Sequence, residues 1–554
     1  MLRIERFTRR EALIVFGIGV LLLLPCIWCE TSITGQDEYW LTFRTPMETL
    51  ERGEWFTPWV NGEPRLKKPP LLYWAMLLSY QLLGINLFAA RIWGVLAGAG
   101  LAACSTLLYR ELFRKSGILA GLITLATISV SIEGRRAMLD LPLAFFTAIT
   151  VFFAIRWGKS GRLAWILSAA LSLGLSFLVK GPVGMVLFGV AAVSALFVFK
   201  RWRFLVSDWR QVLWACILLL AVSLPWPIIM ACLWPDFLKI VDSEVAARGI
   251  GAVHVGSPFS TLGGAFGLVF PWSLILLAAL LRSIHLAKND SDRKALWLSA
   301  WFFGCVIPFF FIRSFARYMT PLIPAAAVLC AHWLDQAKGP WRTILLNISM
   351  SLMGLVAAAF CLFFLWFGKG IVMTAISLSA VGLMLWLTFS KKDVRLAAGS
   401  AALLLCLMMG GVYPSLGINA MPDDLDEMIG SRPIAAFNSS QPSMLSMRMK
   451  RSAMQVRSFV EEDLKKLKNF DGVVFLRKSD AGVFEDMAEK LGMDTVKAGG
   501  FKTFYSRQAW IRFAREDATA ADWKAALKNH SLEALKPTIW YYRVRPQSLN
   551  PSIP

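Results

Sequence analysis

Charged side chains are scarce in this sequence of 554 residues. Asp, Glu, Lys and Arg together make up 17% of the chain, whereas soluble domains contain about 25%. Apolar residues make up 56%, and the mean hydropathy is +0.55. This composition excludes a disordered chain, a fibrous repeat and a soluble nucleic-acid-binding protein, and it indicates an α-helical integral membrane protein.

Several signatures of familiar enzymes are also missing. The sequence has no Walker loop, no GxGxxG or GxSxG motif and no zinc-ligand spacing, and its four histidines are scattered. We therefore expect that no cofactor or metal is required, although external carboxylates could hold a divalent cation loosely. Cys26 and Cys29 form a CxxC pattern within an apolar run, and we interpret them as small packing residues rather than a redox pair.

Thirteen segments contain the roughly 20 apolar residues that a membrane-spanning helix needs. They are 11–29, 88–109, 117–134, 138–156, 163–179, 182–199, 211–233, 259–281, 295–312, 318–335, 343–366, 371–390 and 395–413. The first segment follows a basic start and lacks a clear cleavage site, so we interpret it as a retained anchor rather than a signal peptide.

The distribution of Lys and Arg predicts the orientation of these spans. With the N-terminus in the cytoplasm, every predicted cytoplasmic loop is short and basic, as the positive-inside rule requires. Residues 30–87 and 234–258 then form external loops, and the first contains interfacial helices near 38–52 and 70–83. Residues 1–413 are the predicted membrane domain, and residues 414–554 are a polar external tail.

The tail alternates short β-like and helical patterns, which predicts a small α/β domain. The β-like runs are 472–478, 501–506 and 538–544, and the helical runs are 461–467, 481–491 and 520–535. The tail contains 21 basic and 17 acidic residues, so it accounts for only +4 of the net charge of +21. Much of the remaining positive charge lies in the short cytoplasmic loops that set the orientation.

A small group of cations lies on the external face, where the positive-inside rule does not explain them. Each one alone could extend its side chain to the lipid headgroups. Together they would suit a phosphate held at the membrane surface by a lipid, rather than nucleic acid. The group comprises Lys67, Lys68, Arg136, Lys180, Arg248 and Arg317.

Three acidic residues share this face, and each allows two interpretations. Asp37 and Glu38 directly follow the first span, and Asp140 lies at the start of another span. Each could cap a helix N-terminus. Alternatively, a carboxylate among several cations stays ionised and could take a proton from an attacking hydroxyl or orient it. His254 lies in the second external loop and is a further candidate for the same cavity.

An ordered series of motifs resembles a known family. The series is DEY at 37–39, GEWFTP at 53–58, NGEP at 61–64, KPPLLYW at 68–74, AAR at 89–91, Arg136 and Asp140, KGPVG at 180–184, PW at 225–226, FPW at 270–272, and RY at 317–318. It resembles the polyprenyl-phosphate-sugar-dependent membrane glycosyltransferases. The similarity is greatest to the 4-amino-4-deoxy-L-arabinose lipid A transferases, and the protein O-mannosyltransferases are broader relatives.

The resemblance implies a GT-C fold of about 13 transmembrane helices, with a periplasmic cavity and an undecaprenyl-phosphate-linked sugar as donor. It further implies that Asp37 and Asp140 are the catalytic carboxylates. Lipid-phosphate binding would fall to Lys68, Lys180, Arg248, Arg317 and Tyr318, with Glu38, Lys67, Arg136 and His254 in the same cavity. The implied location is the bacterial inner membrane, with the C-terminal domain in the periplasm, and we expect a monomer.

Two positions depart from the aminoarabinose transferases. The family pattern Glu-Lys-Pro is Lys67-Lys68-Pro69 here, and a tyrosine expected four residues after Asp37 is Leu41. An acidic residue beside the lysine could meet an amino group on the sugar, so Lys67 disfavours a cationic sugar. The donor class is therefore better supported than the individual sugar.

The predicted reaction is an inverting transfer to lipid A or another envelope acceptor. A protein O-glycosyltransferase using the same donor is the alternative enzyme, and its hydroxyl acceptor would need Asp37 as a base. A polytopic transporter or lipid flippase is the alternative from another class. Transporters usually contain internal repeats and charged residues in mid-membrane, whereas this chain gathers its unusual charges at one face.

Overall fold

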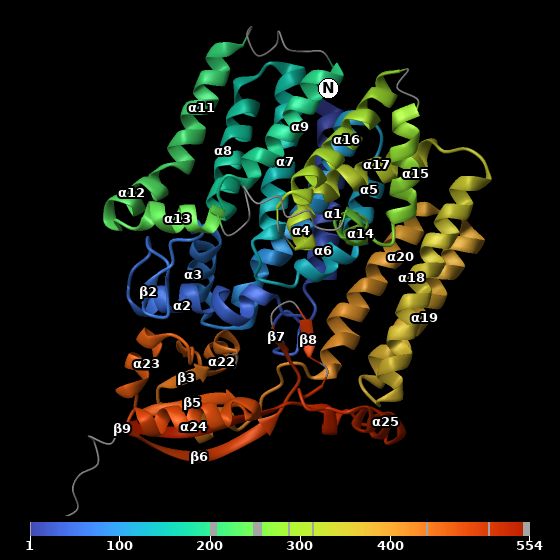
Figure 1. Ribbon diagram of the computed structural model, residues 1–554. Coiled ribbons are helices and arrows are strands. Elements are labelled where there is room, and N and C mark those ends of the chain that lie inside the picture. Colours follow the sequence, from blue (N-terminus) through green and yellow to red (C-terminus); the bar gives the residue numbers. More distant parts are fainter. Residues whose placement is uncertain are drawn as a thin grey trace, which may run out of the picture.

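Figure 1 shows a computed structural model that describes residues 2–199, 208–246, 258–285, 289–312, 315–438, 441–507, 510–512 and 514–546. A bundle of helices forms the larger part, and a sheet domain lies beyond one end of it. The bundle helices are α1 (Leu2–Leu23), α4 (Leu87–Phe113), α5 (Ile118–Leu125), α6 (Ile128–Glu133), α7 (Asp140–Ser160), α8 (Leu163–Lys180), α9 (Val183–Phe199), α11 (Trp209–Ser223), α12 (Pro225–Leu233), α13 (Phe237–Ala246), α14 (Pro258–Leu268), α15 (Ser273–His285), α16 (Asp290–Val306), η2 (Ile307–Phe310), η3 (Ala316–Leu322), α17 (Ile323–Gln336), α18 (Pro340–Trp366), α19 (Ile371–Trp386), η4 (Leu387–Lys391), α20 (Val394–Leu407), η5 (Met408–Val412) and η6 (Tyr413–Leu416).

Every predicted membrane segment coincides with one or more of these helices. Among the described residues, seven helices are long and apolar enough to cross a membrane, and the α14–α15 pair, bent by 108°, is an eighth candidate. The multi-span helical architecture is confirmed, whereas the count of thirteen stays a prediction. Several predicted spans consist of two short helices, such as α5 and α6, because a non-helical turn interrupts the apolar run.

Residues 30–87, the predicted first external loop, form short elements on the sheet-domain side of the bundle. They are η1 (Glu38–Thr42), α2 (Arg44–Glu51), the hairpin of β1 (Trp59–Val60) and β2 (Glu63–Pro64), and α3 (Leu71–Leu83). The two helical regions predicted near 38–52 and 70–83 are therefore present. The hairpin was not predicted, and its turn contains Asn61 and Gly62, which both adopt positive φ.

The tail contains α21 (Leu425–Ile429), β3 (Ile434–Phe437), α22 (Pro442–Met449), β4 (Met454–Val456), α23 (Glu461–Lys468), β5 (Gly472–Arg477), η7 (Lys478–Asp480), α24 (Ala481–Lys490), β6 (Met493–Lys502), β7 (Tyr505–Arg507), β8 (Trp510–Arg512), α25 (Ala520–Lys528), η8 (Glu533–Leu535) and β9 (Thr538–Pro546). Five strands form one sheet in the order β4-β3-β5-β9-β6. The pairs of β3 with β4 and β5 are parallel, and both pairs of β9 are antiparallel.

The predicted α/β tail is confirmed, with differences in the strands. The expected strand at 501–506 includes the end of β6 and most of β7, which are separate strands. Strand β5 is buried along its whole length, which explains why it reads as a continuous apolar run. Strands β3 and β4 were not predicted because they have only four and three residues.

The sheet domain lies beside the elements of the first external loop (Figure 1), and polar contacts join the two. The buried Arg44 guanidinium on α2 donates to the Ala453 carbonyl at 2.6 Å. The Arg448 guanidinium on α22 lies 3.3 Å from the Glu30 carboxylate, and burial raises the pKa of Glu30 although Arg448 favours its charged form. The tail thus contacts both ends of the segment from Glu30 to Arg44, which contains Asp37.

Helix α4 packs against α1, α5, α7 and α17 at the centre of the bundle. At Gly94 a Cβ atom would lie 2.3 Å from the Arg136 carbonyl oxygen, and at Gly98 it would lie 2.7 Å from a Leu23 methyl carbon. The glycines therefore allow α1 and the turn at 134–136 to approach α4 closely. This turn leads directly to Asp140.

We predict that Gly94→Ala destabilises the protein by about 1–3 kcal/mol, because the added methyl group meets backbone that cannot move aside freely. Gly158→Ala on α7 is the matched control, since no atom lies within 4 Å of the Cβ it would add. The measurement is thermal unfolding in detergent. A Gly94→Ala protein that unfolds at the temperature of the control would contradict the close approach.

Candidate active site

Asp140 and Lys180 meet because they occupy adjacent ends of two packed helices. Asp140 is the first residue of α7, Lys180 is the last residue of α8, and a two-residue turn makes the helices antiparallel neighbours. The Lys180 ammonium group forms an ion pair with Asp140 Oδ1. An acidic group at a helix N-terminus and a basic group at a C-terminus also suit the two helix dipoles.

Arg317 and Tyr318 approach this pair from η3, which packs against α7. The Arg317 Nε atom lies 3.3 Å from Asp140 Oδ2, so Asp140 faces two cations. The Lys180 ammonium lies 3.7 Å from the centre of the Tyr318 ring, which is a close cation–π contact. Segments far apart in the sequence therefore build one cluster.

Asp37 joins the cluster from the first external loop. Its Oδ2 atom lies 3.8 Å from Arg317 Nη2. The Asp37 side chain is 44% exposed, whereas the side chains of Asp140, Lys180 and Arg317 are 3%, 7% and 13% exposed. Asp37 is thus the member of this group most accessible to a reacting molecule, and Asp140 pairs with both Lys180 and Arg317 behind it.

Lys68 lies in a different local environment. Its ammonium nitrogen is 2.5 Å from Glu244 Oε1 on α13, and both side chains are partly exposed. The sequence does not point to Glu244, because the hydrophobic pattern does not tell which loops contact one another. The adjacent Lys67 is exposed.

Glu38 and Arg136 differ from the expectation that they line an open cavity. The Glu38 side chain is fully buried, and its carboxylate pairs with the buried Arg91 at 3.2 Å. Arg136 is partly buried and pairs with Glu133 at 2.7 Å. Glu38 therefore acts as an internal anchor. Arg91 was missed as a candidate, although an arginine inside the apolar run 88–109 is a recognisable signal.

Two predicted residues, Arg248 and His254, lie outside the described residues. Among the side chains that the structure does describe, no group of three or more His, Cys, Asp or Glu residues is arranged to hold a metal ion. The Asp37 and Asp140 carboxylates face Arg317, and Asp140 also faces Lys180.

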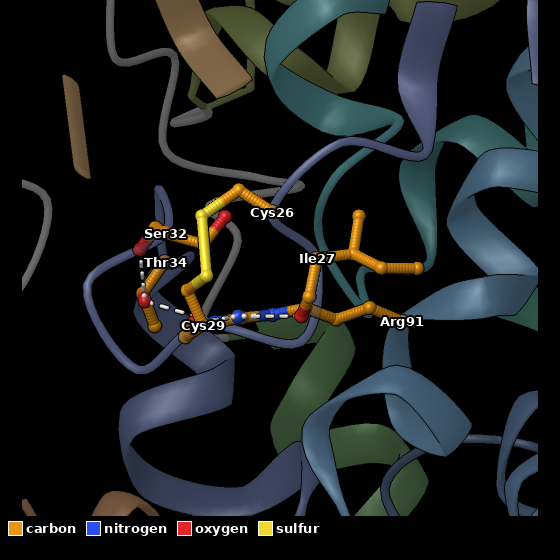
Figure 2. Close-up of a disulfide and its surroundings, with 6 residues drawn as sticks. All are labelled: Cys26, Ile27, Cys29, Ser32, Thr34 and Arg91. Atoms are coloured by element: carbon orange, nitrogen blue, oxygen red, sulfur yellow. Dashed lines mark hydrogen bonds between the residues drawn. A yellow bond between two sulfur atoms is a disulfide. The ribbon is translucent and has the colours of Figure 1, made fainter. Parts of the chain in front are cut away.

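The interpretation of Cys26 and Cys29 as helix-packing residues is wrong. They form a disulfide with a Cα–Cα distance of 5.2 Å in the segment between α1 and η1 (Figure 2). Helix α1 ends at Leu23, and turns follow it. Pro25 lacks the N–H group that a continuing helix needs, so the apolar run extends beyond the helix.

Comparisons with known proteins agree with this architecture. A family model described as dolichyl-phosphate-mannose-protein mannosyltransferase matches residues 40–241. The undecaprenyl phosphate-alpha-4-amino-4-deoxy-L-arabinose arabinosyl transferase of Pseudomonas aeruginosa (strain UCBPP-PA14) is 25% identical over 485 residues, covering 80% of this chain and 85% of that protein. An uncharacterized protein of Aquifex aeolicus is 24% identical over 329 residues, which are 57% of this chain and 64% of that protein.

The fold is similar to that of ArnT from Cupriavidus metallidurans. The crystal structure of that protein bound to undecaprenyl phosphate has a TM-score of 0.71 and 18% identity, and the match covers 96% of this chain and 97% of that one. The apo structure has a TM-score of 0.66 and 19% identity, with 89% and 95% covered. The predicted GT-C fold and family resemblance are thus confirmed, and the chain is a multi-span membrane glycosyltransferase similar to the aminoarabinose and protein mannosyltransferases.

Proposed function

We propose that the chain transfers a sugar from an undecaprenyl-phosphate or similar polyprenyl-phosphate donor to lipid A or a related envelope acceptor. The single observation that carries the proposal is the exposed Asp37 carboxylate beside Arg317, with the Asp140–Lys180 pair buried behind it. The named curated relatives use an undecaprenyl-phosphate-linked aminoarabinose, and the solved ArnT binds undecaprenyl phosphate. Both support the donor class.

The proposed reaction is a single inverting displacement. The bond between the anomeric carbon and the donor phosphate oxygen breaks, and its electron pair leaves with the phosphate. A bond forms between the anomeric carbon and the acceptor oxygen on the opposite face of the sugar. If the acceptor is a hydroxyl group, Asp37 takes its proton. If the acceptor is a phosphate, no proton needs to be removed and Asp37 orients the reactants.

Stabilisation of the leaving phosphate falls to the cations of the candidate site. Lys180 and Arg317 contribute from the cluster that contains Asp140, Lys68 contributes from its separate position beside Glu244, and Arg248 is a further candidate. Arg317 can present several N–H donors in a planar fork, which suits phosphate oxygens. Tyr318 holds the Lys180 ammonium group on its ring face. Asp140 pairs with both Lys180 and Arg317 and offsets part of their positive charge.

The acceptor has one specific alternative. The family model that matches residues 40–241 describes protein mannosyltransferases, so a Ser or Thr hydroxyl of an exported protein is the second candidate. Lys67 favours a neutral sugar over a cationic one in either case. A transporter is disfavoured, because the functionally named relatives reported above are glycosyltransferases.

We further propose that the enzyme acts as a monomer in the bacterial inner membrane, with its active site and tail domain on the periplasmic side. The Cys26–Cys29 disulfide supports this orientation, because it lies in the short segment between α1 and η1 that ends at Asp37. Disulfides persist in oxidising compartments such as the periplasm and are rare in the cytosol.

We predict different consequences for two carboxylate variants. Asp37→Asn should lose most of the turnover without losing stability, because Asp37 is substantially exposed. Asp140→Asn should lose turnover and also about 3–5 kcal/mol of stability, because it removes the carboxylate that pairs with the buried Lys180. The measurements are turnover with a polyprenyl-phosphate sugar and thermal unfolding in detergent. Near-normal turnover of Asp37→Asn would exclude its proposed role.

A second prediction concerns Lys68. Lys68→Ala should lower kcat roughly a hundredfold, since removing one contact to a developing negative charge costs about 3 kcal/mol. The matched control is Lys239→Ala on the same helix as Glu244, because Lys239 is highly exposed and forms a local ion pair with Asp236. Equal activity of the two variants would show that Lys68 does not stabilise the leaving phosphate.

A third prediction distinguishes the acceptors. Glycolipids and glycosylated exported proteins are compared by mass spectrometry between a strain that has this gene and a deletion strain complemented with Asp37→Asn. We expect one lipid A-type glycolipid to disappear. Loss of sugar from exported proteins, with unchanged lipids, would instead identify the protein O-glycosyltransferase.

A further inference from the structure

The chain segment 24–37 connects α1 to η1 and ends at Asp37. The Cys26–Cys29 disulfide closes a short loop within it, and two turn hydrogen bonds continue the loop: Cys29 N–H donates to the Cys26 carbonyl at 3.1 Å, and Ser32 N–H to the Cys29 carbonyl at 3.2 Å. Cys26 has a φ of +66°, which a residue with a side chain seldom adopts. The disulfide therefore constrains a backbone conformation that is unfavourable by itself.

Arg91 on α4 binds this segment at three points (Figure 2). Its Nη1 group donates to the Ile27 carbonyl at 3.2 Å and to the Cys29 carbonyl at 3.0 Å. Its Nη2 group donates to Thr34 Oγ1 at 3.0 Å. Two of the three acceptors are thus carbonyl groups inside the disulfide loop, one of them on a bridged cysteine.

A fourth donor of Arg91 reaches the residue next to Asp37. Arg91 Nε donates to Glu38 Oε1 at 3.2 Å, and both side chains are fully buried. Glu38 Oε1 also accepts from the Ala137 N–H at 2.8 Å, and Glu38 Oε2 accepts from the Gly35 N–H. Asp37 therefore lies between Gly35 and Glu38, which are both held by hydrogen bonds. The Glu38 carboxylate also connects this segment to Ala137, in the turn that leads to Asp140.

This arrangement couples the disulfide to Asp37. A buried ion pair is tolerated only when its remaining donors are satisfied. Arg91 depends on the carbonyl groups of Ile27 and Cys29 for this, and their positions depend on the closed loop. Opening the loop would move acceptors away from a buried guanidinium group, which would have to shift and would move Glu38 and Asp37 with it.

We propose that Arg91 and the Cys26–Cys29 disulfide are positioning elements for Asp37, so that reduction of this disulfide lowers turnover. The inference rests on the role of Asp37 in the proposed function. In the reduction, a dithiol supplies two electrons and two protons, the S–S bond becomes two cysteine thiols, and the dithiol becomes a disulfide. A disulfide oxidant such as oxidised glutathione reverses the exchange.

The experiment compares the purified full-length enzyme with a Cys26→Ser/Cys29→Ser variant. Dithiothreitol should lower kcat of the wild type about tenfold to a hundredfold, because a displacement of about 1 Å in a reacting group has effects up to that order. Oxidised glutathione should restore it. The double variant should have the low kcat from the start and respond to neither reagent, while KM for the donor stays within about twofold, since Asp37 faces the acceptor rather than the donor phosphate.

A Cys216→Ser/Cys232→Ser variant is the matched control, because these two free cysteines are exposed and distant in sequence from the loop. It should respond to dithiothreitol as the wild type does. Because the closed loop is short, the disulfide constrains the unfolded chain little. Loss of the disulfide should therefore change the unfolding temperature little, although kcat falls. If the double variant does not fold, reduction and reoxidation of the wild type decide alone.

Arg91→Lys tests the other half of the proposal. It keeps the charge beside Glu38 but lacks the fork that reaches both carbonyl groups, so a folded variant should have a low kcat that dithiothreitol no longer changes. Full kcat in wild-type enzyme whose Cys26 and Cys29 are shown by alkylation to be reduced would overturn the inference. Normal turnover of Asp37→Asn would instead overturn the proposed function on which it rests.

Discussion

The buried ion pair between Arg91 and Glu38 joins the parts of this protein on which the candidate site depends. Glu38 follows Asp37 directly and also receives the N–H group of Ala137, close to Asp140. Arg91 also donates hydrogen bonds to two carbonyl groups in the segment that follows α1. An unpaired charge at either position would be very costly in an apolar interior, so the packing of α4 against the first loop and the positions of both catalytic candidates are determined together.

The neighbouring charges are likewise paired wherever they are buried. Asp140 and Lys180 are buried and Arg317 is largely buried, and each of the three faces at least one opposite charge. Asp37 is the exception, since it combines proximity to Arg317 with substantial exposure. A group in this position keeps its charge and can still contact a reacting molecule. This difference in burial separates the residue suited to chemistry from those that support it.

The sheet domain contributes to the same region from outside the bundle. Asn419 donates to the Tyr39 hydroxyl at 3.0 Å, and Gln455 N–H donates to Asn61 Oδ1 at 2.8 Å. Together with the contacts of Arg44 and Arg448, these bonds cover the outer side of the first loop. The tail therefore shares in holding the loop that carries Asp37, which gives a physical reason for a polar domain at the end of an apolar chain.

The sequence by itself determined the class of protein, the places of its helical segments, the α/β character of the tail and the family resemblance, because all of these depend on local hydrophobic periodicity and on ordered motifs. It also placed Asp37, Asp140, Lys180, Arg317 and Tyr318 on one face. Only the tertiary structure decided which charges meet. It paired Lys68 with Glu244, and it buried Glu38 against Arg91. It also turned the chain after Leu23, so that Cys26 and Cys29 form a disulfide. Each of these outcomes depends on where a helix stops and on which distant segments pack together, and hydrophobic periodicity contains no information about either.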